Sequence, residues 1–486
     1  MGLGMLLLAI EPVIWLVNSW FEPAHDSKGG WVFLLCAGLF IWSVRSQVSA
    51  VAIKNHRKAI TLLFVTALIR GMGQIFAVNV LGAVALAIDV YAIALLARVS
   101  DRTNPLSAAW LAVLFAFSLP LERIFQRVIG FGLQHLSADG ACLLLHGLFA
   151  DVQCTGIRIL LAGHDVLVDL PCSGVKTLTL LCILFAALMC VFRPSLTRSM
   201  QIGIVTLASA LLANMIRIVC LSIFIAFPEK IAGINVMAQP WHDLIGLFCL
   251  SLAALPLALL CGLRECNQAV IQDAPDDQPV VIPADKIKTW FALGFLSLAA
   301  VIVSLPRQPL DISDTGTALS LPVYLQGQYG QTVALNQQEQ DYFTQFGGTA
   351  LKMRYGHNSA LLIRTNSPLR HLHAPDECLR GLGFDVQYQG IQYQPLPTAI
   401  YIATASNGEQ WRVSVTFYSE SGEYTSNVSE VVWRWLQRPH STWYALQRIT
   451  PAYIPASAAQ QWDAALFAAL DLTPTHSQEN GHDKTY

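Results

Sequence analysis

Long hydrophobic runs separated by short polar segments fill the first two thirds of the chain. A helix that crosses a membrane needs about 20 mostly apolar residues. Such runs predict a polytopic α-helical membrane protein with about eight spans in its core and one further helix as a tether. The first run is the weakest, because Glu11 interrupts it. The predicted spans cover residues 3–20, 31–44, 59–76, 77–97, 106–121, 174–192, 200–226, 243–262 and 289–305.

Basic residues cluster in every second connection between these spans. Cytoplasmic connections carry such an excess of Lys and Arg. We therefore expect a multi-pass membrane protein with its N-terminus inside. Residues 122–171 and everything after 306 then lie outside the cytoplasm. The basic residues concerned are Arg45, Lys54, Arg57, Lys58, Arg98, Arg102, Arg193, Arg198, Arg264, Lys286 and Lys288.

Two further regions are expected to fold outside the lipid. In the long connection, residues 131–149 have helical spacing that suits a surface helix. Two β-rich runs then flank residues 162–165 (Ala-Gly-His-Asp) and predict a hairpin. After residue 306 the pattern becomes that of a soluble α+β domain, with strands near 360–364 and 411–418. Helices are expected near 427–437 and 457–471.

These patterns divide the chain into five regions. The predicted regions are a membrane core (1–265), a cytoplasmic loop (266–288), an additional transmembrane helix (289–305), an extracytoplasmic domain (306–475) and a disordered tail (476–486).

Composition narrows the possible functions. Of the 486 residues, 54% are hydrophobic and 13% are charged, whereas a soluble protein has about 25% charged residues. The net charge of −2 gives no reason to expect a nucleic-acid partner. The eleven cysteines do not form CxxC pairs, so no zinc site is indicated, and we expect no metal or organic cofactor. Cys154, Cys172 and Cys378 lie outside the apolar runs. We expect Cys172 to be a free thiol, the alternative being a disulfide with Cys154 or Cys378.

Three polar residues are expected at one membrane depth, near the outer face. Cys172 begins the sixth span, where a helix N-terminus favours a thiolate, although an inert cysteine at a helix cap is also possible. Arg217 lies within the seventh span at a cost of at least about 2.5–3.5 kcal/mol, unless it reaches the interface. Asn214 shares its helical face. His242 begins the eighth span as a catalyst, an anchor or a cap, and Asp243 is expected to cap that helix.

Together these side chains fit acyl transfer by a thiol. A thiolate attacks a carbonyl carbon, an imidazole moves the proton, and a guanidinium stabilises the oxyanion. The interpretation depends on Cys172, Arg217 and His242 meeting in space, which their places on consecutive helices allow.

The segments that carry these residues resemble the exosortase/archaeosortase family. The three matching motifs are Pro-Cys-Ser-Gly-Val at 171–175, Asn-Met-Ile-Arg-Ile at 214–218 and His-Asp-Leu-Ile-Gly at 242–246. The resemblance covers about residues 1–265. It implies a cysteine peptidase or transpeptidase of the cell inner membrane, which acts at the periplasmic side on exported proteins with a C-terminal signal. Such a signal has a short motif, a membrane helix and a basic tail, as in PEP-CTERM proteins.

By this resemblance the catalytic residues are Cys172, Arg217 and His242. Lys176 stands at a variable position and receives no role. The partners implied are the tailed substrate, membrane lipid and an acceptor nucleophile of unknown kind. The residues expected to support the site are Ser173, Gly174, Asn214 and Asp243.

The C-terminal region has a resemblance of its own. Residues 373–384 (His-Ala-Pro-Asp-Glu-Cys-Leu-Arg-Gly-Leu-Gly-Phe) resemble a motif of the exosortase-associated periplasmic domain, with Phe384 in place of a usual tryptophan. His373 and Cys378 within it are candidates for a second thiol site, and a structural loop is the alternative.

Two other functions fit a multi-helix membrane chain. A membrane glycan polymerase or ligase also has intramembrane arginines and a large outer loop, but it does not need Cys172. A non-catalytic scaffold or transporter is expected to place its polar residues near the bilayer midplane.

Overall fold

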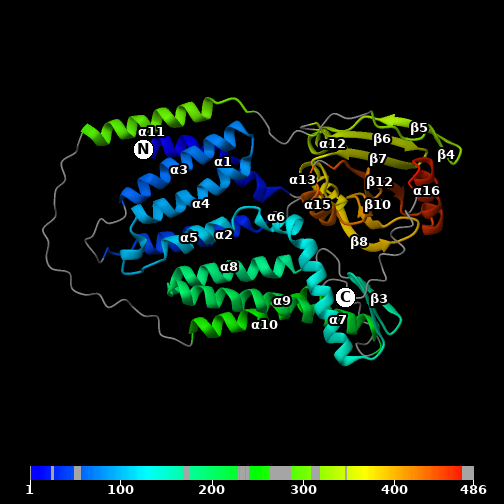
Figure 1. The fold of residues 1–486 in the computed structure, drawn as a ribbon, viewed down its shortest axis with the longest axis horizontal. Coiled ribbons are helices and arrows are strands. Elements are labelled where there is room, and N and C mark those ends of the chain that lie inside the picture. The colour runs from blue at the N-terminus through cyan, green and yellow to red at the C-terminus, as the bar shows by residue number, and fades with distance from the viewer. Residues whose placement is uncertain are drawn as a thin grey trace.

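The structure is a computed structural model that describes most of the chain. Cys172, Ser173, most of the predicted cytoplasmic loop and the predicted tail lie outside the described residues. Figure 1 shows a helical membrane part followed by a C-terminal domain built on a sheet. The described residues are 2–22, 27–48, 56–167, 174–227, 229, 236, 240–262, 286–307, 313, 318–344, 347–439 and 441–472.

Apolar helices form the membrane part. Among the described residues, six helices are long and apolar enough to cross a membrane, and Gly29–Val44 and Ala292–Ser304 are shorter apolar stretches. The prediction of a polytopic helical protein is thus confirmed, whereas its count of eight core spans is not. The helices are α1 (Gly2–Phe21), α2 (Gly29–Val44), α3 (His56–Ile75), α4 (Asn79–Leu96), α8 (Val175–Phe192), α9 (Leu196–Ala226), α10 (Trp241–Gly262) and α11 (Lys286–Ser304).

The predicted span 106–121 is much shorter in the structure. Its helix α5 (Ala108–Ala116) has nine residues, and the chain then turns at Pro120 into α6 (Leu121–Val128). Proline has no N–H to continue a helix but suits the beginning of the next one. Hydropathy alone did not register this break, because the residues around it are apolar.

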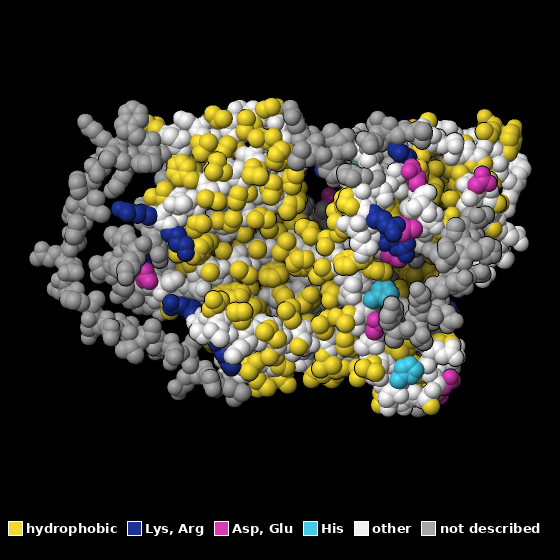
Figure 2. Space-filling model, in the orientation of Figure 1, with side chains coloured by type: hydrophobic (Ala, Val, Ile, Leu, Met, Phe, Trp, Pro, Cys, Tyr) yellow, Lys and Arg dark blue, Asp and Glu magenta, His cyan; other side chains and the backbone are white. Residues whose placement is uncertain are grey.

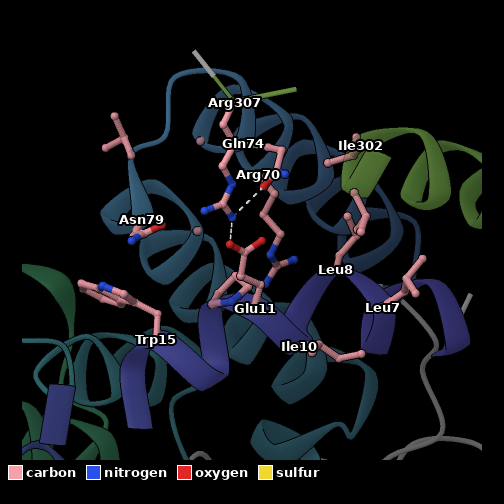
Figure 3. Close-up of a pocket in the computed structure, with 15 residues that line it drawn as sticks. Leu7, Leu8, Ile10, Glu11, Trp15, Arg70, Gln74, Asn79, Ile302 and Arg307 are labelled. Carbon is pink, nitrogen blue, oxygen red and sulfur yellow. Dashed lines mark hydrogen bonds and ion pairs between the residues drawn. The ribbon is translucent and has the colours of Figure 1, made fainter. Parts of the chain in front are cut away.

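A mostly apolar pocket that contains a few charged side chains accounts for the charged residue in the first helix. Figure 3 shows the ion pair between Glu11 of α1 and Arg307, which follows α11. On the facing helices, Arg70 and Asp89 form a buried ion pair of 2.6 Å, and Thr66 donates to Asp89 over 2.7 Å. Each buried charge thus has an opposite charge beside it, as burial requires. The pocket of about 150 Å³ lies among α1, α3, α4 and α11.

The connection between α5 and α8 forms a small subdomain. The helix expected at residues 131–149 is α7 (Gly130–Leu148). The expected hairpin is an antiparallel sheet of three strands, β1 (Val152–Thr155), β2 (Arg158–Leu161) and β3 (His164–Leu167). The additional reversal occurs at Gly156, whose φ of 59° suits glycine.

An antiparallel sheet forms the C-terminal domain. Its strand order is β4-β5-β6-β7-β12-β10-β9-β8, with β11 paired to β10. The strands are β4 (Tyr324–Leu325), β5 (Gln328–Val333), β6 (Thr349–Tyr355), β7 (Asn358–Thr365), β8 (Asp385–Gln392), β9 (Thr398–Thr404), β10 (Gln410–Ser419), β11 (Tyr424–Thr425) and β12 (Trp443–Pro451).

Helices cover both faces of this sheet. Leu361 and Ile363 of β7 join a core with residues of α12 and α15. The alternate residues Ala360 and Leu362 join a second core with α16, because successive side chains of a strand point to opposite faces. The predicted helices near 427–437 and 457–471 are confirmed as α15 and α16. The helices are α12 (Gln337–Phe343), α13 (Pro368–His371), α14 (Pro375–Gly381), α15 (Val428–Gln437) and α16 (Ala456–Ala469).

The sheet domain contacts the membrane part through the beginning of α15. Asn427 donates through Nδ2 to Oε1 of Gln134 in α7 over 3.0 Å. Ser429 donates through Oγ to the carbonyl of Gln126 in α6 over 2.9 Å. Figure 1 shows α6 and α7 between the bundle and this domain. We call the end of the bundle that carries this contact the domain end.

Candidate active site

The guanidinium of Arg217 and the imidazole of His242 are in direct contact. Nη2 of Arg217 lies 2.9 Å from Nε2 of His242. Arg217 lies in the last third of α9, and His242 is in the first turn of α10, so the two antiparallel helices bring them together. Gly246 lies one turn after His242 on the same face of α10. A Cβ at Gly246 would lie 3.5 Å from Cζ of Arg217, so the guanidinium rests against the backbone of α10.

This contact determines which nitrogen of His242 carries the proton. A guanidinium can only donate hydrogen bonds. Nε2 of His242 therefore accepts from Arg217, and the proton of the neutral ring is on Nδ1. Nδ1 lies 3.5 Å from Oδ1 of Asp243. Asp243 is in the first turn of α10, where a helix cap was expected, and its carboxylate faces the imidazole, as expected of a residue that supports the site.

Asn214 connects the site to two other helices. Its side chain is buried and donates through Nδ2 to Oγ of Ser137 in α7 over 3.0 Å. The same side chain packs against Gly174, where an added Cβ would lie 2.8 Å from Nδ2. Gly174 precedes α8 with a φ of 88°, a conformation that side chains with a Cβ rarely adopt. The predicted supporting residues Gly174 and Asn214 are thus brought together.

Ser137 is a site neighbour that sequence reasoning missed. It is fully buried where α7 packs against α9. Helix α7 also approaches α9 closely at Gly140, since a Cβ there would lie 2.5 Å from Cε of Met215. Small residues at positions 137, 140 and 141 mark this face of the helix. Their spacing of three to four residues was the available signal for a buried face.

Among the described residues, the structure therefore gathers Gly174, Asn214, Arg217, His242 and Asp243 near the domain end. Cys172 and Ser173 lie outside the described residues, so their roles stay predictions. The arrangement supplies a fixed positive charge beside a neutral imidazole. Such a pair can hold a carbonyl oxygen or carboxylate and accept a proton.

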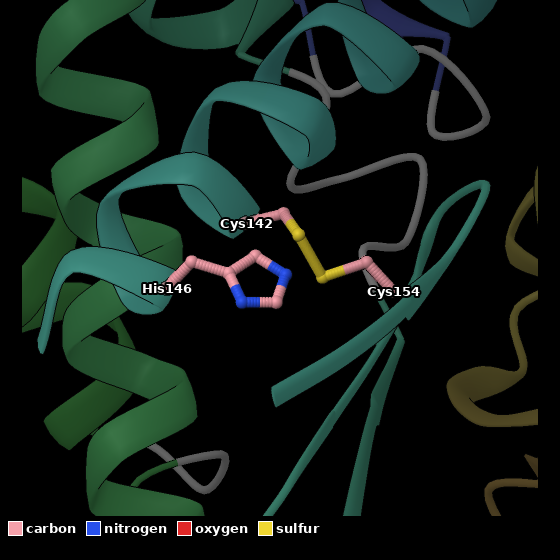
Figure 4. Close-up of side chains that lie close together, drawn as sticks. All are labelled: Cys142, His146 and Cys154. Carbon is pink, nitrogen blue, oxygen red and sulfur yellow. A yellow bond between two sulfur atoms is a disulfide. The ribbon is translucent and has the colours of Figure 1, made fainter. Parts of the chain in front are cut away.

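A disulfide lies in the neighbouring subdomain. Cys142 of α7 and Cys154 of β1 are bonded, and Figure 4 shows His146 beside them. The alternative of a bond between Cys154 and Cys172 is therefore wrong. It failed because Cys142 lies in an apolar helix pattern and was not singled out from the sequence. The bond ties α7, which carries Ser137, to the small sheet.

His373 and Cys378 are also in contact, within the C-terminal domain. Nε2 of His373 contacts Sγ of Cys378. His373 precedes α14 and Cys378 lies in that helix. The structure places this pair in the sheet domain, apart from the helices that carry Arg217 and His242.

Comparison with known proteins identifies the membrane part. No curated protein and no solved structure matches the chain. The family of transmembrane exosortases matches residues 20–259. This range contains Gly174, Asn214, Arg217 and His242, and it ends before the sheet domain. The membrane part of the chain belongs to the transmembrane exosortase family.

Proposed function

We propose that this protein is a sorting cysteine transpeptidase that cleaves exported proteins beside a C-terminal membrane helix with a basic tail. The observation that carries the proposal is the contact of 2.9 Å between Arg217 and His242, within the range that matches exosortases. Gly174, which packs on Asn214 of the same helix as Arg217, follows Cys172 by two residues in the sequence. The proposal assigns Cys172 as the nucleophile.

In the first half of the reaction, the thiol of Cys172 gives its proton to Nε2 of His242. The thiolate attacks the carbonyl carbon of the scissile peptide bond. The C–N bond breaks, the imidazolium gives its proton to the departing amine, and a thioester remains. In the second half, an acceptor amine or water loses a proton to His242, attacks the thioester carbon and releases the thiolate.

The contact between Arg217 and His242 adds a step before this chemistry. Nε2 of His242 is occupied by a donor from Arg217 and cannot accept a thiol proton at the same time. A substrate oxyanion or carboxylate is a better partner for the guanidinium. We propose that the bound substrate takes Arg217 as its partner and thereby frees Nε2. The proton acceptor is then available only when substrate is present.

The proposal places the domain end of the bundle on the periplasmic side of the inner membrane. Two observations support this orientation. The Cys142–Cys154 disulfide lies near this end, and disulfides persist in oxidising compartments. Figure 2 shows that Lys and Arg side chains gather at the opposite end of the hydrophobic helical part, as expected for a cytoplasmic end.

Replacing the proposed nucleophile tests the function. Cys172→Ala is expected to abolish cleavage of a tailed substrate, measured as the shift of its band on a gel, while the protein stays inserted. Cys182→Ala is the matched control, because Cys182 lies further along α8 in an apolar run. Normal cleavage by Cys172→Ala would refute the proposal and favour a function that needs no thiol, such as glycan transfer.

A further inference from the structure

The His373–Cys378 pair in the C-terminal domain has a rigid, chemically suited geometry. Nε2 of His373 contacts Sγ of Cys378. The His373 side chain is buried, with 4% of its surface exposed. Its ring stacks on Phe343, with ring centres 5.3 Å apart and an angle of 5° between the planes. The imidazole therefore has one orientation, with Nε2 directed at the thiol, and Cys378 itself remains partly exposed.

A nearby histidine shows what a purely structural role looks like in this segment. His371 is 1% exposed and lies 2.7 Å through Nδ1 from Oγ1 of Thr365, a residue of the adjoining strand β7. That contact connects α13 to the sheet. His373 instead directs Nε2 at a sulfur atom, which is a poor partner for fixing a fold because thiols are weak donors and acceptors.

A cavity adjoins His373 on the side of the membrane part. It has a volume of about 460 Å³ and lies between the sheet domain and helices α1, α4 and α6. His373 belongs to its wall. So do Arg370 of the domain, Arg127 of α6 and Glu22, which follows α1. Arg127 also donates through Nη1 to the carbonyl of Leu369 over 2.9 Å, so both sides of the cavity are held together.

The cavity has the character of an organic binding site. Apolar side chains make up most of its remaining wall, and the two arginines outnumber the one carboxylate. A volume of this size is within the range of ligand pockets in proteins. The wall thus suits an apolar group that also carries a negative charge. The apolar members of the wall are Trp15, Val80, Pro120, Ile124, Val128 and Leu369.

We propose that His373 and Cys378 form a second nucleophilic thiol site, which accepts acyl groups from anionic esters or thioesters. In this proposal the cavity that His373 lines holds the acyl donor. His373 takes the proton of the Cys378 thiol, and the sulfur attacks the carbonyl carbon. The bond from that carbon to the leaving oxygen or sulfur breaks, and the imidazolium gives its proton to the leaving group. The product is an S-acyl group on Cys378. The site is independent of Cys172.

The first test measures the reactivity of Cys378 in the full-length protein in detergent. The protein is treated with iodoacetamide at pH 7, and alkylation of Cys378 is followed by peptide mass spectrometry. An ordinary thiol is only a few per cent ionised at this pH, so a base in contact can raise its rate by roughly tenfold or more. We expect His373→Gln to lose that advantage. His371→Gln, which removes the structural neighbour, is expected to leave the rate of Cys378 unchanged.

The second test measures acyl transfer with the acetyl thioester of N-acetylcysteamine and with the succinyl thioester as its anionic counterpart. Cys378 is expected to become S-acylated in the wild type and equally in Cys172→Ala, with the succinyl probe reacting faster. Arg370→Gln should remove the preference for the anionic probe while Cys378 still reacts. Because the Cys172→Ala protein is used, the outcome is independent of the proposed sorting activity.

Two results would overturn the second site. One is a Cys378 that reacts no faster than an ordinary thiol in the wild type. The other is a rate that falls equally in His373→Gln and His371→Gln, which would show that only the local fold matters. Circular dichroism of each variant separates loss of folding from loss of the base, and Cys378→Ser, which keeps the size of the side chain, confirms the site of modification.

Discussion

At the scale of a single residue, Gly174 allows the backbone at the beginning of α8 to pack closely against Asn214. It combines a φ of 88° with a distance of 2.8 Å between an added Cβ and Nδ2 of Asn214. An L-residue in this conformation costs roughly 1–2 kcal/mol before any clash is counted. A side chain at the first described residue before α8 would therefore add strain and displace Asn214.

A pair of glycine variants separates strain from contact. Gly163 has a φ of 79° in the β2–β3 turn, but an added Cβ would meet nothing within 4 Å. Gly163→Ala adds strain alone, whereas Gly174→Ala adds strain and displaces Asn214. We expect Gly174→Ala to reduce substrate cleavage by roughly tenfold or more, since 1.4 kcal/mol corresponds to tenfold in rate. Equal cleavage by the two variants would show that the contact with Asn214 is unimportant.

Arg217 tests whether the site needs a guanidinium or only a positive charge. Arg217→Lys keeps the charge but loses the planar fork that contacts His242 and the proposed oxyanion. Loss of one oxyanion donor costs about 10²–10³ in rate, so we expect kcat for cleavage to fall by at least about 100-fold.

Arg198 of the same helix provides the matched control. It lies near the other end of α9 and donates to the carbonyl of Leu260 over 3.4 Å, away from His242. Arg198→Lys is expected to retain near-normal kcat with the same tailed substrate. Near-normal turnover by Arg217→Lys would reduce Arg217 to an interface anchor.

At the scale of elements, the sequence predicted helices better than their interruptions. A long apolar run is a strong signal because lipid leaves the backbone no partner except itself. The break at Pro120 and the additional turn at Gly156 are local events inside apolar or β-rich runs, so hydropathy did not separate them. The same reason hid Cys142, whose pattern within α7 is that of an ordinary buried face.

The disulfide between α7 and β1 is expected to stabilise the protein. Cys142 and Cys154 close a loop with a sequence separation of 12, and a loop of about this length is worth roughly 3 kcal/mol in the chain-entropy account. Cys142→Ser is expected to lower the Tm of the full-length protein in detergent. It should also make Cys154 reactive to maleimide without reduction.

Cys182→Ser is the control for this variant, since Cys182 is a free cysteine, and its Tm should stay near that of the wild type. Labelling of Cys154 in the unreduced wild type would contradict the assigned pair. The Cys172 thiol is expected to be labelled by maleimide in the wild type and in Cys142→Ser.

At the scale of the whole molecule, the sequence revealed the candidate site only in part. Arg217 stood out because a charge in an apolar helix is costly, and His242 and Gly174 stood out through motifs. Ser137 did not, because a serine in an amphipathic helix has no cost that marks it. The sequence likewise did not predict the docking of the sheet domain. The hydrogen bond between Gln134 and Asn427 joins residues 293 positions apart, and Gln and Asn are common on protein surfaces, so neither residue indicates a specific partner.

The docked domain leads to the last prediction. Removing residues 308–486 preserves Arg307 and thus its ion pair with Glu11, so the membrane part should remain inserted. The truncated protein lacks the domain and therefore its contacts with α6 and α7. In the full-length protein the tether holds the domain beside the bundle at an effective concentration of roughly millimolar. We expect the truncated protein to turn over tailed substrate more slowly or to release a different product, measured by mass spectrometry of the cleaved protein.

A full-length variant shows whether docking itself is responsible. The double variant Gln134→Ala/Asn427→Ala keeps the whole domain but removes one of the hydrogen bonds that hold it. If docking positions the substrate or acceptor, this variant should shift turnover or product in the same direction as the truncation, by a smaller amount. If the truncated protein cleaves at the normal rate and yields the normal product, the domain serves another reaction, and the acyl chemistry proposed for Cys378 is then separate from sorting. The two outcomes are distinguishable because a domain with an unrelated role does not change the rate or the product of cleavage at the Arg217–His242 site.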